Sequence, residues 1–128
     1  MAPRDDLSEL LATLSPRRVP GEFVFVSVAD PPRDADIRAL VREDEGVSCV
    51  LERNEADRRG LHYDLVLAWI TLDVTSSLET VGLTHAVSEA LTRFGIGCNV
   101  VAGYHHDHLL VPRDLADEGR SSAPNRRW

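Results

Sequence analysis

Residues 83–111 read LTHAVSEALTRFGIGCNVVAGYHHDHLLV, and this stretch decides the predicted fold. Its first part predicts a helix over about Leu83–Phe94, because apolar residues recur there at helical spacing. Gly95 is a suitable stop, since glycine adopts the left-handed conformation that often follows a helix. The apolar stripe of this helix consists of Leu83, Val87, Ala90, Leu91 and Phe94.

The second part of the stretch predicts two strands, Cys98–Tyr104 and His108–Val111. They are close enough in sequence to pair as a hairpin through His105–Asp107. Before the helix, Tyr63–Thr75 is rich in β-forming residues. Its apolar and polar positions alternate from Ile70 onward, which predicts a strand with one covered face and one more polar face.

After the hairpin, Pro112 begins a weak helical stretch that extends to about Glu118. The second half therefore has the order strand–helix–strand–strand–helix, which is a ferredoxin-like α+β order without its last strand. We expect the first half or a partner chain to supply that strand, because an unpaired sheet edge promotes aggregation. The two halves are thus expected to share a sheet or to pack against each other.

The first half is predicted to be mostly strands. A helix over Asp5–Leu14 precedes a turn at Pro20–Gly21, and Glu22–Val28 then forms a strand that is apolar, and therefore expected to be buried, on both faces. Two further strands, Ile37–Arg42 and Val47–Leu51, are predicted to pair as a hairpin. Gly46 lies at the tip of this hairpin.

A short helix is predicted over Asn54–Arg59, with Asn54 as its cap and Gly60 as its stop. The predicted organisation is an N-terminal half over 5–62 and a C-terminal half over 63–118. Residues 119–128 are expected to be a disordered tail, because they consist mainly of small, polar and arginine residues.

Composition excludes several classes of function. The 128 residues are 43% hydrophobic and 27% charged, which is typical of a soluble globular protein. The formal net charge of −7 argues against a nucleic-acid partner, which requires a basic surface. No apolar run reaches the ~18 residues that span a bilayer, so no membrane partner is expected. The sequence contains no lysine, which excludes Schiff-base chemistry.

The N-terminal segment and the two cysteines indicate the cellular compartment. Charged residues at Arg4, Asp5 and Asp6 are unlike a secretory signal, so a cytoplasmic location is expected. Cys49 and Cys98 form no C-x-x-C pair and lie in apolar stretches, which predicts buried free thiols.

The segment Cys98–His108, together with shorter stretches between Val19 and Thr84, is similar to a family of small bacterial ACT-domain proteins. The most specific of these segments is Cys98–His108, CNVVAGYHHDH, and the similarity covers about residues 7–111. The supporting segments are Val19–Phe25, Arg42–Gly46, Trp69–Leu72, Ser76–Leu78 and Val81–Thr84.

This resemblance implies a ferredoxin-like βαββα fold in two tandem ACT-like units with no attached catalytic domain. It implies a non-catalytic regulatory sensor that binds an amino acid, needs no cofactor and forms a homodimer. The ligand-binding residues that it implies are Ser76, Ser77, Val81, Gly82 and Leu83 in a loop, and Asn99, Val100 and Val101 on the following strand.

The chemistry of these residues suits an amino acid. Gly82 allows a ligand to approach the backbone closely. Ser76, Ser77 and Thr84 supply hydroxyl groups, and Asn99 both donates and accepts hydrogen bonds. A purely structural interpretation also stands, in which Ser76 and Thr84 cap the loop and the helix and Gly82 only permits the turn.

The run His105–His108 is the second candidate site. His106 and His108 share one face of an extended chain, and two imidazoles with a nearby carboxylate could hold a divalent metal. The run lies at a predicted turn, however, so we expect Asp107 to stabilise that turn and predict no metal site. A metal-dependent enzyme is the least favoured function. A structural module whose strand edges pair with another protein is the main alternative to the sensor.

Overall fold

The structure, a computed structural model, describes residues 16–73, 89, 98–114 and 116. The chain divides into two compact units: residues 1–19 with 68–128 (unit 1), and residues 20–67 (unit 2). The division passes through strand β1 (Pro16–Val28), so β1 contributes to both units. The expected ACT-like halves over 5–62 and 63–118 stay a prediction.

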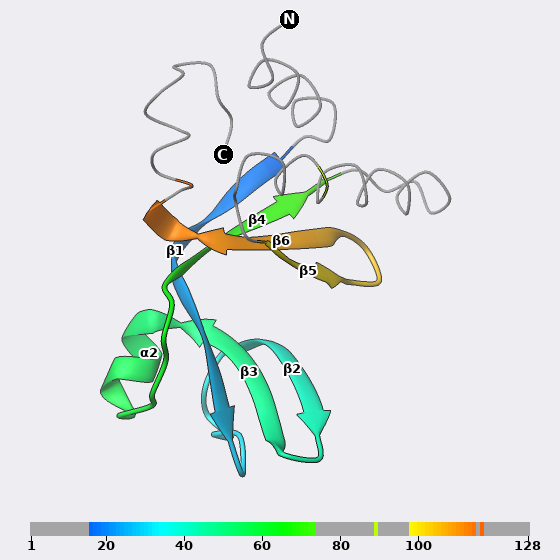
Figure 1. Cartoon of the computed structure of the whole chain (residues 1–128). Helices are drawn as coiled ribbons and strands as arrows, with labels where there is room; N and C mark the ends of the chain where they lie inside the picture. Colours follow the sequence, from blue (N-terminus) through cyan, green and yellow to red (C-terminus); the bar gives the residue numbers. More distant parts are fainter. Residues whose placement is uncertain (1–15, 74–88, 90–97, 115, 117–128) are drawn as a thin grey trace, which may run out of the picture. The chain divides into compact units, whose positions relative to one another are not determined.

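Unit 2 is an antiparallel sheet with one short helix (Figure 1). Its strand order is β2-β3-β1, where β2 is Ile37–Glu43 and β3 is Gly46–Glu52. The predicted hairpin of β2 and β3 is confirmed, with Glu43 opposite Gly46 at its tip. Gly46 has a φ of 153°, a conformation that residues with side chains rarely adopt, which explains the glycine at this turn.

Strand β1 is longer than predicted. It begins at Pro16 and passes through Pro20 and Gly21, where a turn was expected. Gly21 has a φ of 108°, a conformation that glycine adopts more easily than other residues, so the strand can continue through this irregular position. The prediction of two buried faces is also only partly correct: Phe23 is fully buried, but Phe25 on the same face is 39% exposed.

One face of the unit 2 sheet forms a hydrophobic core. Alternate residues of β1 and β3 point to this face because side chains alternate along a strand. The helix α2 (Arg53–Arg58) packs its one fully buried side chain, Ala56, into the same cluster. The buried members are Val24, Val26, Val47, Cys49, Leu51 and Ala56.

Helix α2 begins one residue earlier than predicted. Strand β3 ends at Glu52 and the helix follows at once, so Glu52 is the N-cap residue and makes no side-chain capping bond. The assignment of Asn54 as the cap is therefore wrong, because Asn54 lies inside the first turn. The predicted stop is confirmed: Gly60 has a φ of 66°, and its amide donates to the Asp57 carbonyl at 3.1 Å.

In unit 1 the described strands have the order β1-β4-β6-β5. All six residues of β4 (Leu67–Leu72) are buried, including Thr71, which is 2% exposed. The predicted polar face is therefore wrong at Thr71, whereas Asp73 on the same face is exposed and Thr75 lies outside the described residues. The strand has a neighbour on each side, and the buried Thr71 hydroxyl is hydrogen-bonded, so its burial carries little penalty.

The predicted hairpin near the C-terminus is confirmed. Strand β5 (Asn99–Ala102) pairs antiparallel with β6 (Asp107–Pro112), with Ala102 opposite Asp107. The turn lies earlier than expected, because the Gly103 amide donates to the His106 carbonyl at 2.9 Å. Asp107, which was predicted to stabilise the turn, is the first residue of β6 and is only 7% exposed.

Other predicted elements fall wholly or largely outside the described residues. These are the helix over 5–14, the tail over 119–128 and most of the helix over 83–94, of which only Glu89 is described. Arg113, Asp114 and Ala116 are helical, in agreement with a helical start after Pro112. No helix among the described residues is long and apolar enough to cross a membrane.

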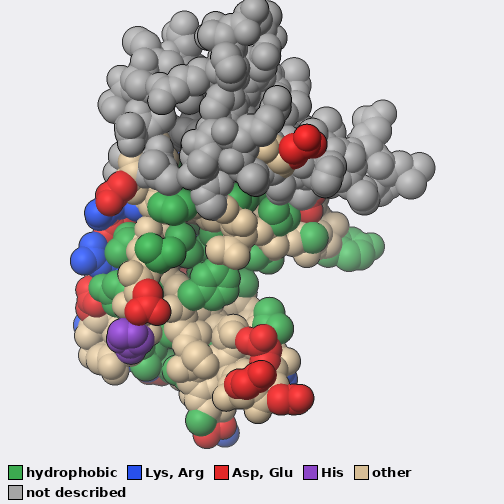
Figure 2. Space-filling view, viewed as in Figure 1, with side chains coloured by type: hydrophobic (Ala, Val, Ile, Leu, Met, Phe, Trp, Pro, Cys, Tyr) green, Lys and Arg blue, Asp and Glu red, His purple; other side chains and the backbone are tan. Residues whose placement is uncertain are grey.

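Acidic side chains gather on the surface of unit 2 (Figure 2). Glu43, Asp44 and Glu45 at the β2–β3 turn are all exposed. The acidic run is thus a solvated turn within the described part of the chain.

Candidate functional site

The predicted ligand residues divide into two sets. Five of them lie outside the part of the chain that the structure describes: Ser76, Ser77, Val81, Gly82 and Leu83. The other three lie on β5, which is the terminal strand in the order of unit 1. Asn99 and Val100 are exposed and Val101 is half-buried, so the Asn99 amide is accessible from solvent.

The histidine run is divided between the turn and strand β6. His105 is exposed at the turn and stacks edge-on against Tyr104, with 5.0 Å between the ring centroids. His106 is half-buried, and its Nδ1 atom has no hydrogen-bond partner among the described residues. No group of three potential metal ligands occurs within the described part of the chain.

His108 belongs to a polar contact between β4 and β6. Its Nδ1 atom lies 3.2 Å from Nε1 of Trp69 and 3.0 Å from the hydroxyl of Thr71. The indole N–H can only donate, and it also reaches the Thr71 hydroxyl at 3.2 Å. This geometry gives His108 a structural role that the alternation of the sequence did not predict.

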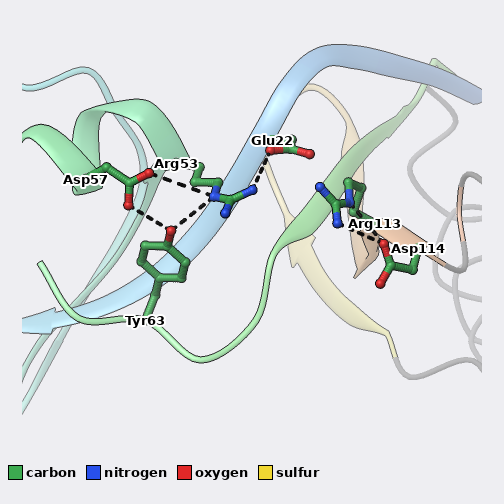
Figure 3. A network of polar contacts seen from close by, with 6 residues as sticks. All are labelled: Glu22, Arg53, Asp57, Tyr63, Arg113 and Asp114. Atoms are coloured by element: carbon green, nitrogen blue, oxygen red, sulfur yellow. Dashed lines mark hydrogen bonds and ion pairs between the residues drawn. The ribbon is translucent and has the colours of Figure 1, made fainter.

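A cluster around Arg53 in unit 2 is the most extensive network of polar side chains in Figure 3. Arg53 Nη1 donates to Glu22 Oε1 at 3.0 Å, and Arg53 Nε donates to the Tyr63 hydroxyl at 3.0 Å. The Tyr63 hydroxyl in turn donates to Asp57 Oδ1 at 2.7 Å. The hydrogen bonds of Arg53 raise its pKa above the usual range. The bond to Tyr63 contributes most, and the bond to Glu22 is second.

A cavity of about 150 Å³ opens beside this cluster. The wall carries two carboxylates and one guanidinium. Glu22 lies near the centre of β1, and Glu52 and Arg53 lie where β3 joins α2. The lining residues are Gly21, Glu22, Glu52, Arg53 and Asn54. A pocket that combines acidic, basic and amide groups can bind a small polar molecule.

Sequence reasoning did not identify this cavity. Glu22 and Arg53 are 31 residues apart, and no spacing rule connects a residue in a strand to one at the start of a distant helix. Arg53 lies just before the helix that was predicted over Asn54–Arg59, and nothing in the pattern indicated that β1 lies beside it.

Both cysteines are free and poorly suited to nucleophilic chemistry. Cys49 is buried, and desolvation raises the pKa of its thiol. Cys98 is half-buried, and desolvation raises its pKa to about 11. Because the thiolate is the reactive form, neither thiol is activated at neutral pH. The prediction of free thiols is thus confirmed, although Cys98 is not fully buried.

The family comparison identifies the chain. A family model described as ACT domain matches residues 3–68, more than half of the sequence. The chain belongs to the ACT domain family. An ACT domain is commonly a small-molecule regulatory module, and its family membership indicates a ferredoxin-like fold.

Two solved structures are similar to this ACT-domain chain. A Vibrio cholerae protein of unknown function, described as a possible transport protein, is 38% identical, with a TM-score of 0.76. The match covers 94% of this chain and 95% of that one. An Agrobacterium tumefaciens protein is 21% identical over 83% of each chain, with a TM-score of 0.68, which shows a common fold alone. No curated protein gives a significant match.

The ACT domain match includes the whole of unit 2. It ends at Ala68, so the cavity near Arg53 lies within the matched range and the predicted ligand residues from Ser76 to Val101 lie beyond it. The two candidate sites therefore consist of different residues in different parts of the sequence.

Proposed function

We propose that this chain is a non-catalytic regulatory module that binds an amino acid. The ACT domain match over more than half of the chain carries the proposal, because ACT domains are commonly small-molecule regulatory modules.

The ligand site that we propose combines the loop over residues 76–83 with strand β5. On β5, Asn99 offers a donor and an acceptor to the charged groups of an amino acid, and its exposure leaves it accessible. Gly82 would allow the ligand to approach the backbone of the loop. The adjoining positions Val100 and Val101 would supply apolar contact.

We further propose that the chain has two tandem ACT-like halves, over 5–62 and 63–118, and functions as a homodimer in the cytoplasm. The support for the homodimer is the terminal position of β2 and β5 in the described strand orders, since a terminal strand can pair with another chain.

The alternative function is a protein-interaction module without a ligand. The observation in its favour is the exposure of apolar side chains on the terminal strand β2, where Leu40 is 40% exposed and Val41 is 57% exposed. In that case a partner would bind by extending the sheet.

Thermal unfolding of the full chain with each of the twenty amino acids, and with a divalent metal or a chelator, tests the proposal. A ligand at about 100 times its dissociation constant adds about 2.7 kcal/mol to the free energy of unfolding. For a domain of this size that raises the melting temperature by about 5–15 °C. We expect one amino acid, or a few related ones, to produce such a shift.

Variants locate the binding. Gly82→Phe and Asn99→Ala should each remove the shift, whereas Gly119→Phe and Asn125→Ala should retain it. Retention of the shift in both Gly82→Phe and Asn99→Ala would show that the ligand binds elsewhere. If no amino acid raises the melting temperature, the result would favour the interaction module. A shift with a metal or a chelator alone would favour a site at the histidine run.

A further inference from the structure

The wall of the unit 2 cavity is shaped by a glycine. A Cβ atom at Gly21 would lie 3.7 Å from Glu52 Oε1 and 3.9 Å from the Phe23 ring. A side chain at this position would therefore occupy space beside the Glu52 carboxylate. The φ of 108° at Gly21 also disfavours any other residue there. The glycine thus keeps one face of the carboxylate open to the cavity.

The charge of Arg53, the basic residue on the cavity wall, is balanced by neighbouring carboxylates. Arg53 donates to Glu22 at 3.0 Å and to Tyr63 at 3.0 Å, and its Nε atom lies 3.8 Å from Asp57 Oδ2. Two hydrogen-bond acceptors, Glu22 in β1 and Tyr63 after α2, fix the orientation of the guanidinium, and the Asp57 carboxylate of α2 forms an ion pair with it. Arg53 is therefore a preorganised part of the wall whose charge is balanced by the carboxylates around it.

Glu52 differs from the other charged residues that line the cavity. Its carboxylate makes no hydrogen bond or ion pair with any residue that the structure describes. The lining residues carry two carboxylates and one guanidinium, so the cavity has a formal charge of −1 that resides on Glu52 once Glu22 is paired with Arg53. The charge that complements this wall is a cation.

We propose that this cavity binds the ammonium group of a small molecule, with Glu52 as the anionic contact and the Asn54 amide beside it. The interaction depends on side chains, and the amides of the six-residue helix α2 have no part in it. The volume of about 150 Å³ restricts the ligand to a small molecule. Small amines and small zwitterions both satisfy this chemistry.

This proposal is independent of the amino-acid site proposed above. None of the residues that line the cavity belongs to the set on the 76–83 loop and β5. The cavity can therefore bind an ammonium group whether or not the chain is an amino-acid sensor, and each proposal can fail alone.

The test is a titration of the full chain, labelled with ¹⁵N, by ethanolamine, glycine and acetate, followed by amide chemical shifts. We expect ethanolamine or glycine to shift the amides of residues 21, 22 and 52–54, and acetate to leave them unchanged. Glu52→Gln should weaken that binding by up to about fivefold, since an accessible ion pair contributes at most about that factor. Glu45→Gln, which removes an exposed carboxylate outside the cavity, is the matched control and should bind as the native chain does.

The outcomes distinguish a small amine from a small zwitterion as the ligand. Binding of both ethanolamine and glycine shows that the ammonium group suffices, and binding of glycine alone shows that a zwitterion is required. Binding of acetate alone, equal binding by Glu52→Gln, or no shift at these residues up to high millimolar concentration would overturn the proposal. The amide chemical shifts of residues far from the cavity should be the same in Glu52→Gln and in the native chain, which checks that the variant is folded.

Discussion

The indole Nε1 of Trp69 lies 3.2 Å from Nδ1 of His108, and the two rings are tilted by 48° with 5.2 Å between their centroids. Because the indole N–H can only donate, this contact requires Nδ1 of His108 to act as an acceptor. His108 was considered as a metal ligand from the sequence, and the structure instead uses it to join β4 and β6.

Replacement of His108 by phenylalanine keeps an aromatic ring but removes the acceptor. We expect His108→Phe to lower the free energy of unfolding by about 1 kcal/mol, the usual contribution of one hydrogen bond. Urea unfolding followed by circular dichroism measures this change. His62→Phe, at an exposed histidine, should change stability by less than about 0.5 kcal/mol. Equal effects of the two substitutions would contradict the assigned role.

The unit 2 core should be sensitive to the loss of side-chain volume. Leu51 is fully buried in the cluster on β1 and β3, so Leu51→Ala should cost about 2–5 kcal/mol through lost burial and the remaining cavity. Leu65 is 60% exposed, and Leu65→Ala is the matched control with an expected change below about 0.5 kcal/mol. Chemical denaturation of both variants gives the comparison, and a small loss at Leu51 would show that the core is assigned wrongly.

Gly103 should not tolerate a side chain. A Cβ atom there would lie 2.8 Å from the His106 carbonyl oxygen, which is backbone and cannot move without changing the turn. We expect Gly103→Ala to destabilise the β5–β6 hairpin by about 1–3 kcal/mol, as overpacking does. Gly60→Asn is the control, because asparagine tolerates the left-handed conformation and no atom lies within 4 Å of the added Cβ. Amide hydrogen exchange of β5 would detect the loss, and unchanged protection would refute it.

The contribution of Cys98 to the free energy of unfolding should depend on pH. Desolvation raises its pKa from 9.0 to about 11, so the folded state favours the neutral thiol. This contribution to stability is fully present below about pH 9 and declines as the pH rises from about 9 to about 11.

Alkylation kinetics test the raised pKa of Cys98. At pH 9 the folded chain should react with iodoacetamide at Cys98 more slowly than the urea-unfolded chain, because less thiolate is present. Peptide mapping by mass spectrometry distinguishes Cys98 from Cys49 in the same sample. Equal rates for folded and unfolded Cys98 would show that its pKa is not raised.

Local patterns in the sequence determined the hairpins and the helix stop. Gly46 between two alternating segments predicted the β2–β3 hairpin, and Gly60 predicted the end of α2. These signals succeed because backbone conformation at a turn depends on a few adjacent residues. The resemblance also led to the ACT domain family, although only two of its segments, Val19–Phe25 and Arg42–Gly46, lie within the matched residues 3–68.

Tertiary structure alone decided the features that depend on neighbouring elements. Thr71 is polar, and only the presence of strands on both sides of β4 explains why it is buried and bonded to Trp69. The cavity near Arg53 likewise requires β1 to lie beside the start of α2, across 31 residues of sequence. Such contacts are fixed by the packing of the whole sheet, which residue spacing within one strand or helix does not encode.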